Sequence, residues 1–134
     1  MNDIGQVSIV RHTKNYEGMV KFYLVDLGMD ITQQWDHPDN RGTLLAFGGK
    51  SGSTAVEVLE LGEEAVPGVK PVNVVLSIEV TDADMWHDRL VRRGTTIARG
   101  LEDAPWGHRG FGIDDPDGMR IWYYQDMNKK NKSR

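Results

Sequence analysis

A chain of 134 residues, of which 39% are hydrophobic, is long enough to form one compact domain with a buried core. Its formal net charge of −4 gives no electrostatic support for nucleic-acid binding. The absence of cysteine excludes disulfides, thiolate zinc sites and cysteine nucleophiles. No apolar run approaches the roughly 18 residues of a membrane span, and residues 1–8 lack a signal-peptide pattern. We therefore expect a soluble cytoplasmic protein with neither a nucleic-acid nor a membrane partner.

The first half of the chain predicts a strand, a helix and three further strands. A β-branched run over residues 6–11 indicates the first strand. Asn15 is the expected N-cap of the helix, and Gly28 is expected to end it in the left-handed conformation. The later elements are predicted as strands at 31–35, 43–47 and 54–61, with a polar loop at 37–42 and a turn at 48–52.

The same order of elements returns after a linker predicted at residues 62–72, where prolines disfavour helix. A β-branched strand at 72–80 is followed by Thr81 and Asp82, either of which would cap a second helix that ends at Gly94. The expected buried positions of this helix are Met85, Trp86, Leu90 and Val91. After it come a short strand at 95–98, a loop at 100–105, and strands at 107–114 and 119–125.

The last two strands are predicted to form a hairpin around residues 115–118, Asp-Pro-Asp-Gly. Proline presets the backbone of a turn, aspartate binds nearby amides, and glycine accepts a positive φ. Gly110 and Gly112 share one face of the first hairpin strand. Because glycine weakens a strand, such a pair often marks a place where another group approaches the backbone. We interpret the hairpin as one wall of a ligand cleft.

The two halves align about 66 residues apart, which indicates an internal repeat. The predicted fold class is α+β, with two βαβββ modules at about residues 5–61 and 72–126 of a single domain spanning 1–127. Their mixed sheets are expected to curve around a cleft, with the helices on the convex face. Residues 128–134 contain no apolar side chain and are predicted to be a basic disordered tail.

Two motifs resemble the vicinal oxygen chelate superfamily, which includes glyoxalases, bleomycin-resistance proteins and extradiol dioxygenases. The first is Phe22-Tyr23 followed by Leu27-Gly28-Met29 at the end of the first helix. The second is Pro105-Trp106-Gly107-x-Arg109 followed by the Asp-Pro-Asp-Gly turn. The resemblance covers about residues 5–126. It implies paired βαβββ modules, commonly a homodimer, and a cleft on the concave faces of the sheets.

In the metal enzymes of this superfamily, side chains from the first and last strands of each module bind one divalent ion. The corresponding positions here are Ser8, Glu57, Val75 and Trp122. Valine and tryptophan offer no lone pair, and serine is a weak ligand, whereas a catalytic site needs about three imidazole or carboxylate ligands. We therefore expect no metal, no cofactor and no catalytic residue of the family type.

Alternation along the strands separates residues that pack under the helices from residues on the concave faces. His108 falls on the same face as Gly110 and Gly112, whereas Arg109 falls on the opposite face and is expected to form a structural salt bridge. The other histidines, His12, His37 and His87, are expected at the surface, although the loop that carries His37 could border the cleft. The candidate ligand-binding residues are Trp122, Tyr124, Glu57, His108, Ser8, Ser77, Trp35, Trp106 and Arg120.

The leading hypothesis is a metal-free small-molecule binding protein, because aromatic rings with a few convergent polar groups suit a planar or cationic ligand. It resembles the bleomycin-resistance branch, in which a homodimer sequesters an antibiotic. Alternatives are a divergent metal-dependent lyase or dioxygenase, or a metal-free isomerase that uses Glu57 or His108 as its base. A further alternative is a paralogue whose dimer supports another protein.

Overall fold

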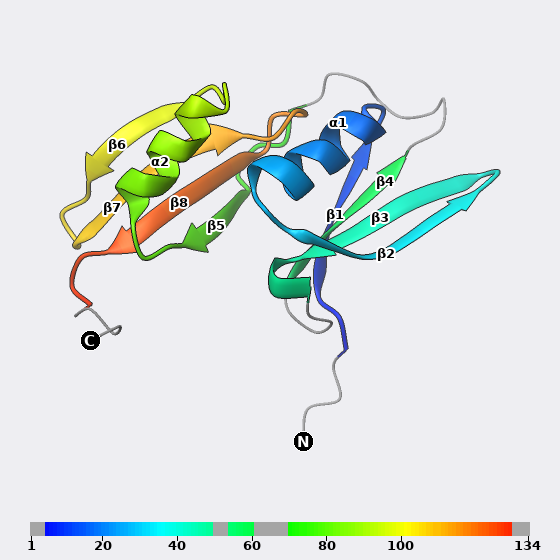
Figure 1. The fold of residues 1–134 in the computed structure, drawn as a ribbon, viewed down its shortest axis with the longest axis horizontal. Helices are drawn as coiled ribbons and strands as arrows, with labels where there is room; N and C mark the ends of the chain where they lie inside the picture. The colour runs from blue at the N-terminus through cyan, green and yellow to red at the C-terminus, as the bar shows by residue number, and fades with distance from the viewer. Residues whose placement is uncertain (1–4, 50–53, 61–69, 130–134) are drawn as a thin grey trace. The chain divides into compact units, whose positions relative to one another are not determined.

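The structure is a computed structural model that describes residues 5–49, 54–60 and 70–129. The chain divides into two compact units, Met1–Val69 and Lys70–Arg134. Each unit contains a mixed sheet and a helix that precedes the second strand of that sheet (Figure 1).

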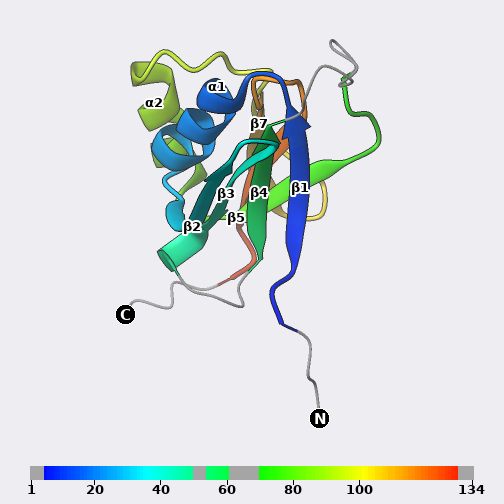
Figure 2. The ribbon, with the colours of Figure 1, turned by 90° about the vertical axis from the view of Figure 1, so that its right-hand side faces the viewer.

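Within the described residues, the first unit contains a four-stranded sheet in the order β1-β4-β3-β2, with β1 parallel to β4. Helix α1 lies on one side of this sheet (Figure 2). The Asn15 side chain caps the helix by accepting a hydrogen bond from the Gly18 amide, and Gly28 follows the helix with φ +76°. The elements are β1 (Ser8–Thr13), α1 (Tyr16–Lys21), η1 (Phe22–Asp26), β2 (Asp30–His37), β3 (Asn40–Ala46), η2 (Phe47–Gly49) and β4 (Ala55–Glu60).

The second unit repeats this plan, with the described strands in the order β5-β8-β7-β6 and β5 parallel to β8. Asp82 rather than Thr81 caps helix α2, because its carboxylate accepts a hydrogen bond from the Met85 amide. Gly94 follows the helix with φ +87°. The elements are β5 (Val75–Glu79), α2 (Ala83–Arg92), β6 (Arg99–Asp103), β7 (His108–Asp114) and β8 (Arg120–Asp126).

The order of elements confirms the predicted α+β fold of two βαβββ modules. In each unit the core lies between the helix and the sheet face that it covers. The first core includes Met19, Tyr23, Leu27, Leu45 and Val58, all nearly inaccessible to solvent. The second includes Leu90, Phe111, Ile113, Ile121 and Tyr123.

The hairpin turn between β7 and β8 forms as its residues predict. The Asp115 side chain is buried and accepts hydrogen bonds from the amides of Asp117 and Met119, at 3.0 and 2.9 Å. Gly118 adopts φ +96°, and its amide donates to the Asp115 carbonyl. Three backbone amides are thus held by one residue, which fixes the register of the hairpin.

Two predicted boundaries are wrong. The expected loop at 37–42 is reduced to the turn between His37 and Asn40, because strand pairing continues to the end of both strands and Trp35 Nε1 donates to Asn40 Oδ1 at 3.1 Å. The expected strand at 95–98 is also absent, since β6 begins at Arg99 and occupies most of the predicted loop. Pairing with β7, through a register shift between Arg99 and Glu102, outweighs the low strand propensity of its glycine and acidic residues.

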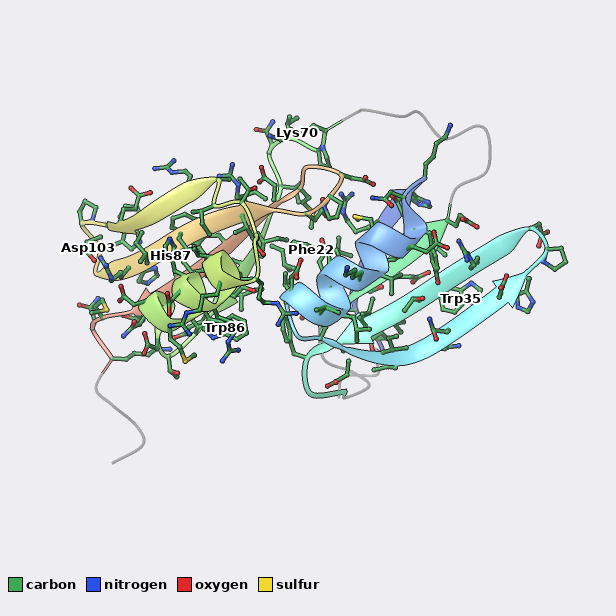
Figure 3. All side chains as sticks on the ribbon, turned by 45° about the horizontal axis from the view of Figure 1, so that its top comes forward. Phe22, Trp35, Lys70, Trp86, His87 and Asp103 are labelled. Carbon is green, nitrogen blue, oxygen red and sulfur yellow. The ribbon has the colours of Figure 1, made fainter. Side chains whose placement is uncertain are left out.

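The buried face of α2 also differs from the prediction. Met85 and Val91 are 43% and 47% exposed, whereas Ala83 and Leu90 are fully buried. Trp86, labelled on α2 in Figure 3, is half-buried. Its ring stacks on that of Tyr123, with ring centroids 5.3 Å apart. His87, expected at the surface, is half-buried because its ring packs edge-on against Phe111 at 5.2 Å. The helix is therefore turned so that two of its ring side chains cover the core.

Candidate ligand-binding site

Each sheet has one face under its helix and an opposite face, here called the distal face. In β8, Ile121 and Tyr123 are buried, whereas Arg120, Trp122 and Tyr124 on the distal face are only half-buried. The same alternation in the first unit buries Val56 and Val58 of β4 and leaves Glu57 and Leu59 half-buried. The predicted division between core and distal-face residues is therefore confirmed for these strands.

Aromatic rings gather on the distal face of the second sheet. His108 and Tyr124, on adjacent strands, stack with their ring centroids 4.5 Å apart and their planes 17° from parallel. Trp106 meets His108 edge-on at 6.5 Å and is 68% exposed. The structure thus brings three of the predicted site residues into one row, which we call the aromatic row.

Groups of β8 lie against the spaced glycines of β7. A Cβ atom added at Gly110 would lie 2.6 Å from the Tyr123 carbonyl oxygen and 2.7 Å from the Trp122 indole. A Cβ atom added at Gly112 would lie 3.0 Å from Arg120 Cδ and 3.4 Å from the indole. The glycine pair therefore makes room for neighbouring groups of the same sheet, so it is not by itself a mark of ligand contact.

Polar groups border the rings of the second unit. Ser77 is exposed and pairs in register with Trp122. Arg120 donates a hydrogen bond from Nε to Asp114 Oδ1 at 2.7 Å, which places a predicted ligand residue in an intramolecular ion pair. Glu79 is a register partner of Tyr124 and accepts a hydrogen bond from Lys129 Nζ at 2.6 Å.

The distal face of the first sheet carries a different set of side chains. Glu57 pairs in register with Val10 on β1 and with Leu44 on β3, so its half-buried carboxylate has aliphatic neighbours. Ser8 lies one row away on β1. Trp35 lies across Gly42 of the adjacent strand, where an added Cβ would overlap its ring. This unit therefore contributes one tryptophan and one carboxylate of the predicted site.

On the helix-covered face of each sheet, an arginine forms ion pairs with a carboxylate of the helix. Arg109 donates to both carboxylate oxygens of Asp84 at 3.1 and 3.0 Å and to Asp103 at 3.1 Å, which confirms the expected structural salt bridge. The guanidinium holds the pKa of Asp84 below its usual range through these hydrogen bonds. Arg41 has the same role in the first unit, through Glu60 and Glu17, and also stacks on the Tyr16 ring at 4.1 Å. Sequence reasoning did not find Arg41, because its partners are far apart in the chain.

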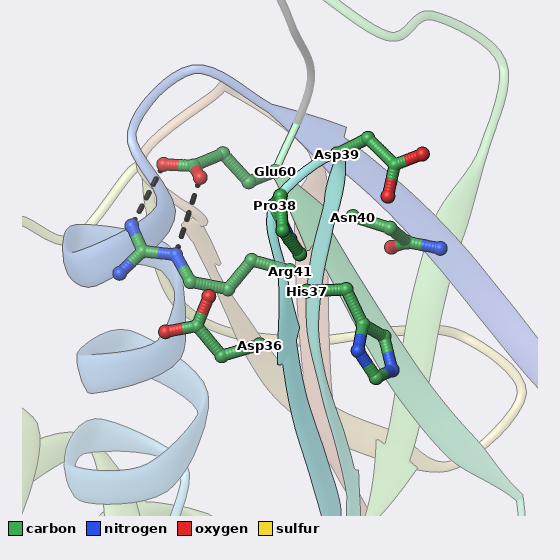
Figure 4. A pocket seen from close by; sticks show the side chains of 7 residues that line it. All are labelled: Asp36, His37, Pro38, Asp39, Asn40, Arg41 and Glu60. Carbon is green, nitrogen blue, oxygen red and sulfur yellow. Dashed lines mark hydrogen bonds and ion pairs between the residues drawn. The ribbon is translucent and has the colours of Figure 1, made fainter.

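A polar hollow of about 400 Å³ lies at the tip of the β2–β3 hairpin (Figure 4). Among its lining residues, Arg41 and Glu60 already satisfy one another through two hydrogen bonds. His37 is the lining residue that sequence analysis considered as a possible border of the site, and the nine predicted ligand-binding residues lie elsewhere. The lining residues are Asp36, His37, Pro38, Asp39, Asn40, Arg41 and Glu60.

Residues 5–123 match the family model of the Glyoxalase/Bleomycin resistance protein/Dioxygenase superfamily. The chain belongs to this superfamily. No curated protein matches the chain.

Solved structures of the superfamily share its fold. TnmS3, an antibiotic binding protein from Streptomyces sp. CB03234, is 24% identical, with 94% of this chain and 99% of that chain covered and a TM-score of 0.73. A superfamily member from Sphaerobacter thermophilus DSM 20745 is 27% identical, with 90% and 95% covered and a TM-score of 0.68. The trypanothione-dependent glyoxalase I of Leishmania major is 20% identical, with 90% and 86% covered and a TM-score of 0.72.

Metal enzymes of this superfamily bind a divalent ion through four side chains. The residues at the corresponding positions here, Ser8, Glu57, Val75 and Trp122, do not form a suitable set of ligands. Val75 and Trp122 in the second unit provide no lone pair, so Glu57 would be the only strong ligand. Over residues 5–49, 54–60 and 70–129, no three or more His, Asp or Glu side chains gather in a way that could hold a metal ion. The expectation of no metal and no cofactor stays a prediction. In the same ranges, no helix is both long and apolar enough to cross a membrane.

Proposed function

We propose that this superfamily member is a metal-free small-molecule binding protein that takes up an aromatic or cationic, antibiotic-like ligand. The observation that carries the proposal is the Trp122 indole, which lies against Gly110 and Gly112 at a position where metal enzymes of the superfamily carry a ligand. An indole held in one orientation presents a large apolar surface with little loss of side-chain entropy on binding. The ring is thus preorganised for stacking rather than for coordinating an ion.

The neighbours of Trp122 support the same class of ligand. Tyr124 and His108 form a stacked pair on the same face, and Trp106 remains largely exposed beside them. Ligand sites typically combine such rings with a few polar groups that fix orientation. In the second unit those groups are Ser77 and Arg120. We propose Ser8, Glu57 and Trp35 as the ligand-contacting residues on the distal face of the first unit.

The comparison with TnmS3 supports an antibiotic-like ligand by analogy, since that protein is described as antibiotic binding. We further propose that the protein acts as a homodimer, as the superfamily resemblance implies, that it is cytoplasmic, and that it binds its ligand without transforming it. If the protein were instead a metal-free isomerase, a carboxylate or imidazole base would have to lie within hydrogen-bonding distance of the substrate proton that it removes. Glu57 and His108 are the two groups that would act as this base.

The test is a thermal-shift panel of aromatic and cationic antibiotics, run on protein treated with a chelator. A ligand that binds only the native state stabilises it by about 2.7 kcal/mol at a concentration of 100 Kd, so the melting temperature should rise. Elemental analysis of protein purified without chelator is the companion measurement. Stoichiometric Ni, Zn, Fe or Mn, or shifts that appear only after a divalent metal is added, would contradict the proposal and favour a metal-dependent enzyme.

A further inference from the structure

The segment after β8 is hydrogen-bonded to the loop that carries Trp106, one residue of the aromatic row. The Met127 amide donates to the Gly107 carbonyl at 2.8 Å, and Asn128 Nδ2 donates to the Trp106 carbonyl at 3.1 Å. Gly107 has φ +94°, and a Cβ there would overlap the Asn128 side chain. Met127 and Asn128 are therefore joined by hydrogen bonds to the loop between β6 and β7.

This arrangement brings the Lys129 ammonium to Glu79. The Nζ–Oε2 distance is 2.6 Å, and the two side chains remain 46% and 40% exposed. Glu79 pairs in register with Tyr124, and Tyr124 stacks on His108, so the ion pair lies at the end of the aromatic row. The pKa of Lys129 is raised, chiefly by its hydrogen bond to Glu79 and also by the charges of Glu79 and Asp126.

We propose that Glu79 is a cation subsite beside the aromatic row, and that Lys129 occupies it in the free protein until a positively charged group of a ligand displaces it. The inference rests on the proposed function and narrows its ligand class to an aromatic ring that carries a positive charge. A half-exposed ion pair is weak, so an incoming cation can replace the lysine at little cost. A stacked aromatic neighbour strengthens the interaction with a cation.

The pairing of Lys129 with Glu79 also favours cationic ligands over neutral and anionic ones. A neutral aromatic compound that displaced Lys129 would leave the Glu79 carboxylate without its partner, and an anionic one would be repelled by it. A cationic compound replaces Lys129 as the partner of the Glu79 carboxylate and also stacks on the aromatic row. Lys129 is therefore expected to lower the apparent affinity for cations, whereas Glu79 is expected to raise it.

The experiment uses two planar probes that share one ring system, neutral phenanthridine and N-methylphenanthridinium, titrated calorimetrically into full-length protein at pH 8. The variants are Lys129→Gln, Glu79→Gln and the double variant. Lys21→Gln is the matched control, because Lys21 is exposed on α1 and the change in net charge is the same. Melting temperatures of all variants check that each is folded.

We expect Lys129→Gln to tighten binding of the cation by about two- to fivefold, the range typical of a partly exposed ion pair, and to leave phenanthridine unchanged. Glu79→Gln should weaken binding of the cation. In the double variant, Lys129→Gln should no longer increase the affinity for the cation. If phenanthridine binds while Lys129→Gln fails to tighten the cation, or tightens it no more than Lys21→Gln, the inference is wrong and the proposed function stands. If neither probe binds any variant, the inference fails and the antibiotic panel alone decides the proposed function.

Discussion

The two units share a backbone plan but differ in the chemistry of their distal faces. In both units the strands have the same order, an arginine forms an ion pair with the helix, and a tryptophan lies against a glycine of the neighbouring strand. In the second unit Trp122 shares the distal face with the stacked rings of Tyr124 and His108. In the first unit the distal face that carries Trp35 also carries aliphatic side chains and Glu57. The repeat therefore fixes where side chains lie, and substitution on one face decides what they can bind.

The largest expected effect concerns the glycine that supports each tryptophan. A methyl group at Gly110 would lie 2.6 Å from the backbone carbonyl oxygen of Tyr123, which cannot move without shifting β8. We expect Gly110→Ala to lower the free energy of unfolding by about 1–3 kcal/mol. Gly42→Ala should cost less, because the atoms nearest to the added methyl group belong to the side chains of Trp35 and Leu59, which can move without a shift of the backbone. Urea unfolding of both variants measures the difference in stability. Equal losses of unfolding free energy would contradict the claim that the β8 backbone leaves less room at Gly110 than side chains leave at Gly42.

Next in size is the effect of each tryptophan on ligand binding. Removing a stacked ring typically costs about 0.5–1.5 kcal/mol beyond the buried area, so Trp122→Ala should weaken a ligand from the antibiotic panel by roughly tenfold. Trp35→Ala should have a smaller effect, because among the described residues the distal face of the first sheet has no stacked pair of rings comparable to Tyr124 and His108. Calorimetric titration gives both values. A greater loss in Trp35→Ala would reverse the assignment of the main binding surface.

The smallest expected effect is a difference in acid sensitivity. The pKa of Asp84 lies below its ordinary value of 3.8, chiefly because of Arg109, so its contribution to stability is present above about pH 4 and is lost as the pH falls through the lowered pKa. Arg109→Met should abolish this loss of stability at low pH, because the pKa of Asp84 is then no longer lowered by the guanidinium. The pKa of Glu17 is lowered first by a backbone hydrogen bond and only then by Arg41, so Arg41→Met should remove less of the corresponding loss. Melting temperatures between pH 7 and pH 2 provide the comparison, and identical profiles for the two variants would contradict it.

Local chemistry explains what the sequence alone could predict. Asn15 and Gly28 bound the first helix, and Asp115 with Gly118 specifies the hairpin turn, because each acts on its own neighbours along the chain. Strand alternation likewise placed His108 and Tyr124 on one face. Prediction was wrong where distant pairing decides the outcome, as in β6 and on the buried face of α2. The Lys129–Glu79 pair was also missed, since it joins residues 50 positions apart.

The most direct test of a metal-free aromatic site is to follow the indole N–H signals of the four tryptophans by NMR in chelator-treated protein. A ligand from the antibiotic panel should move the signal of Trp122 most and those of Trp106 and Trp35 less. Trp86 is the internal control, because its ring stacks on Tyr123 on the helix side of the sheet and should stay unchanged. A Trp122 signal that stays in place at saturating ligand, or that moves only after a divalent metal is added, would contradict the account.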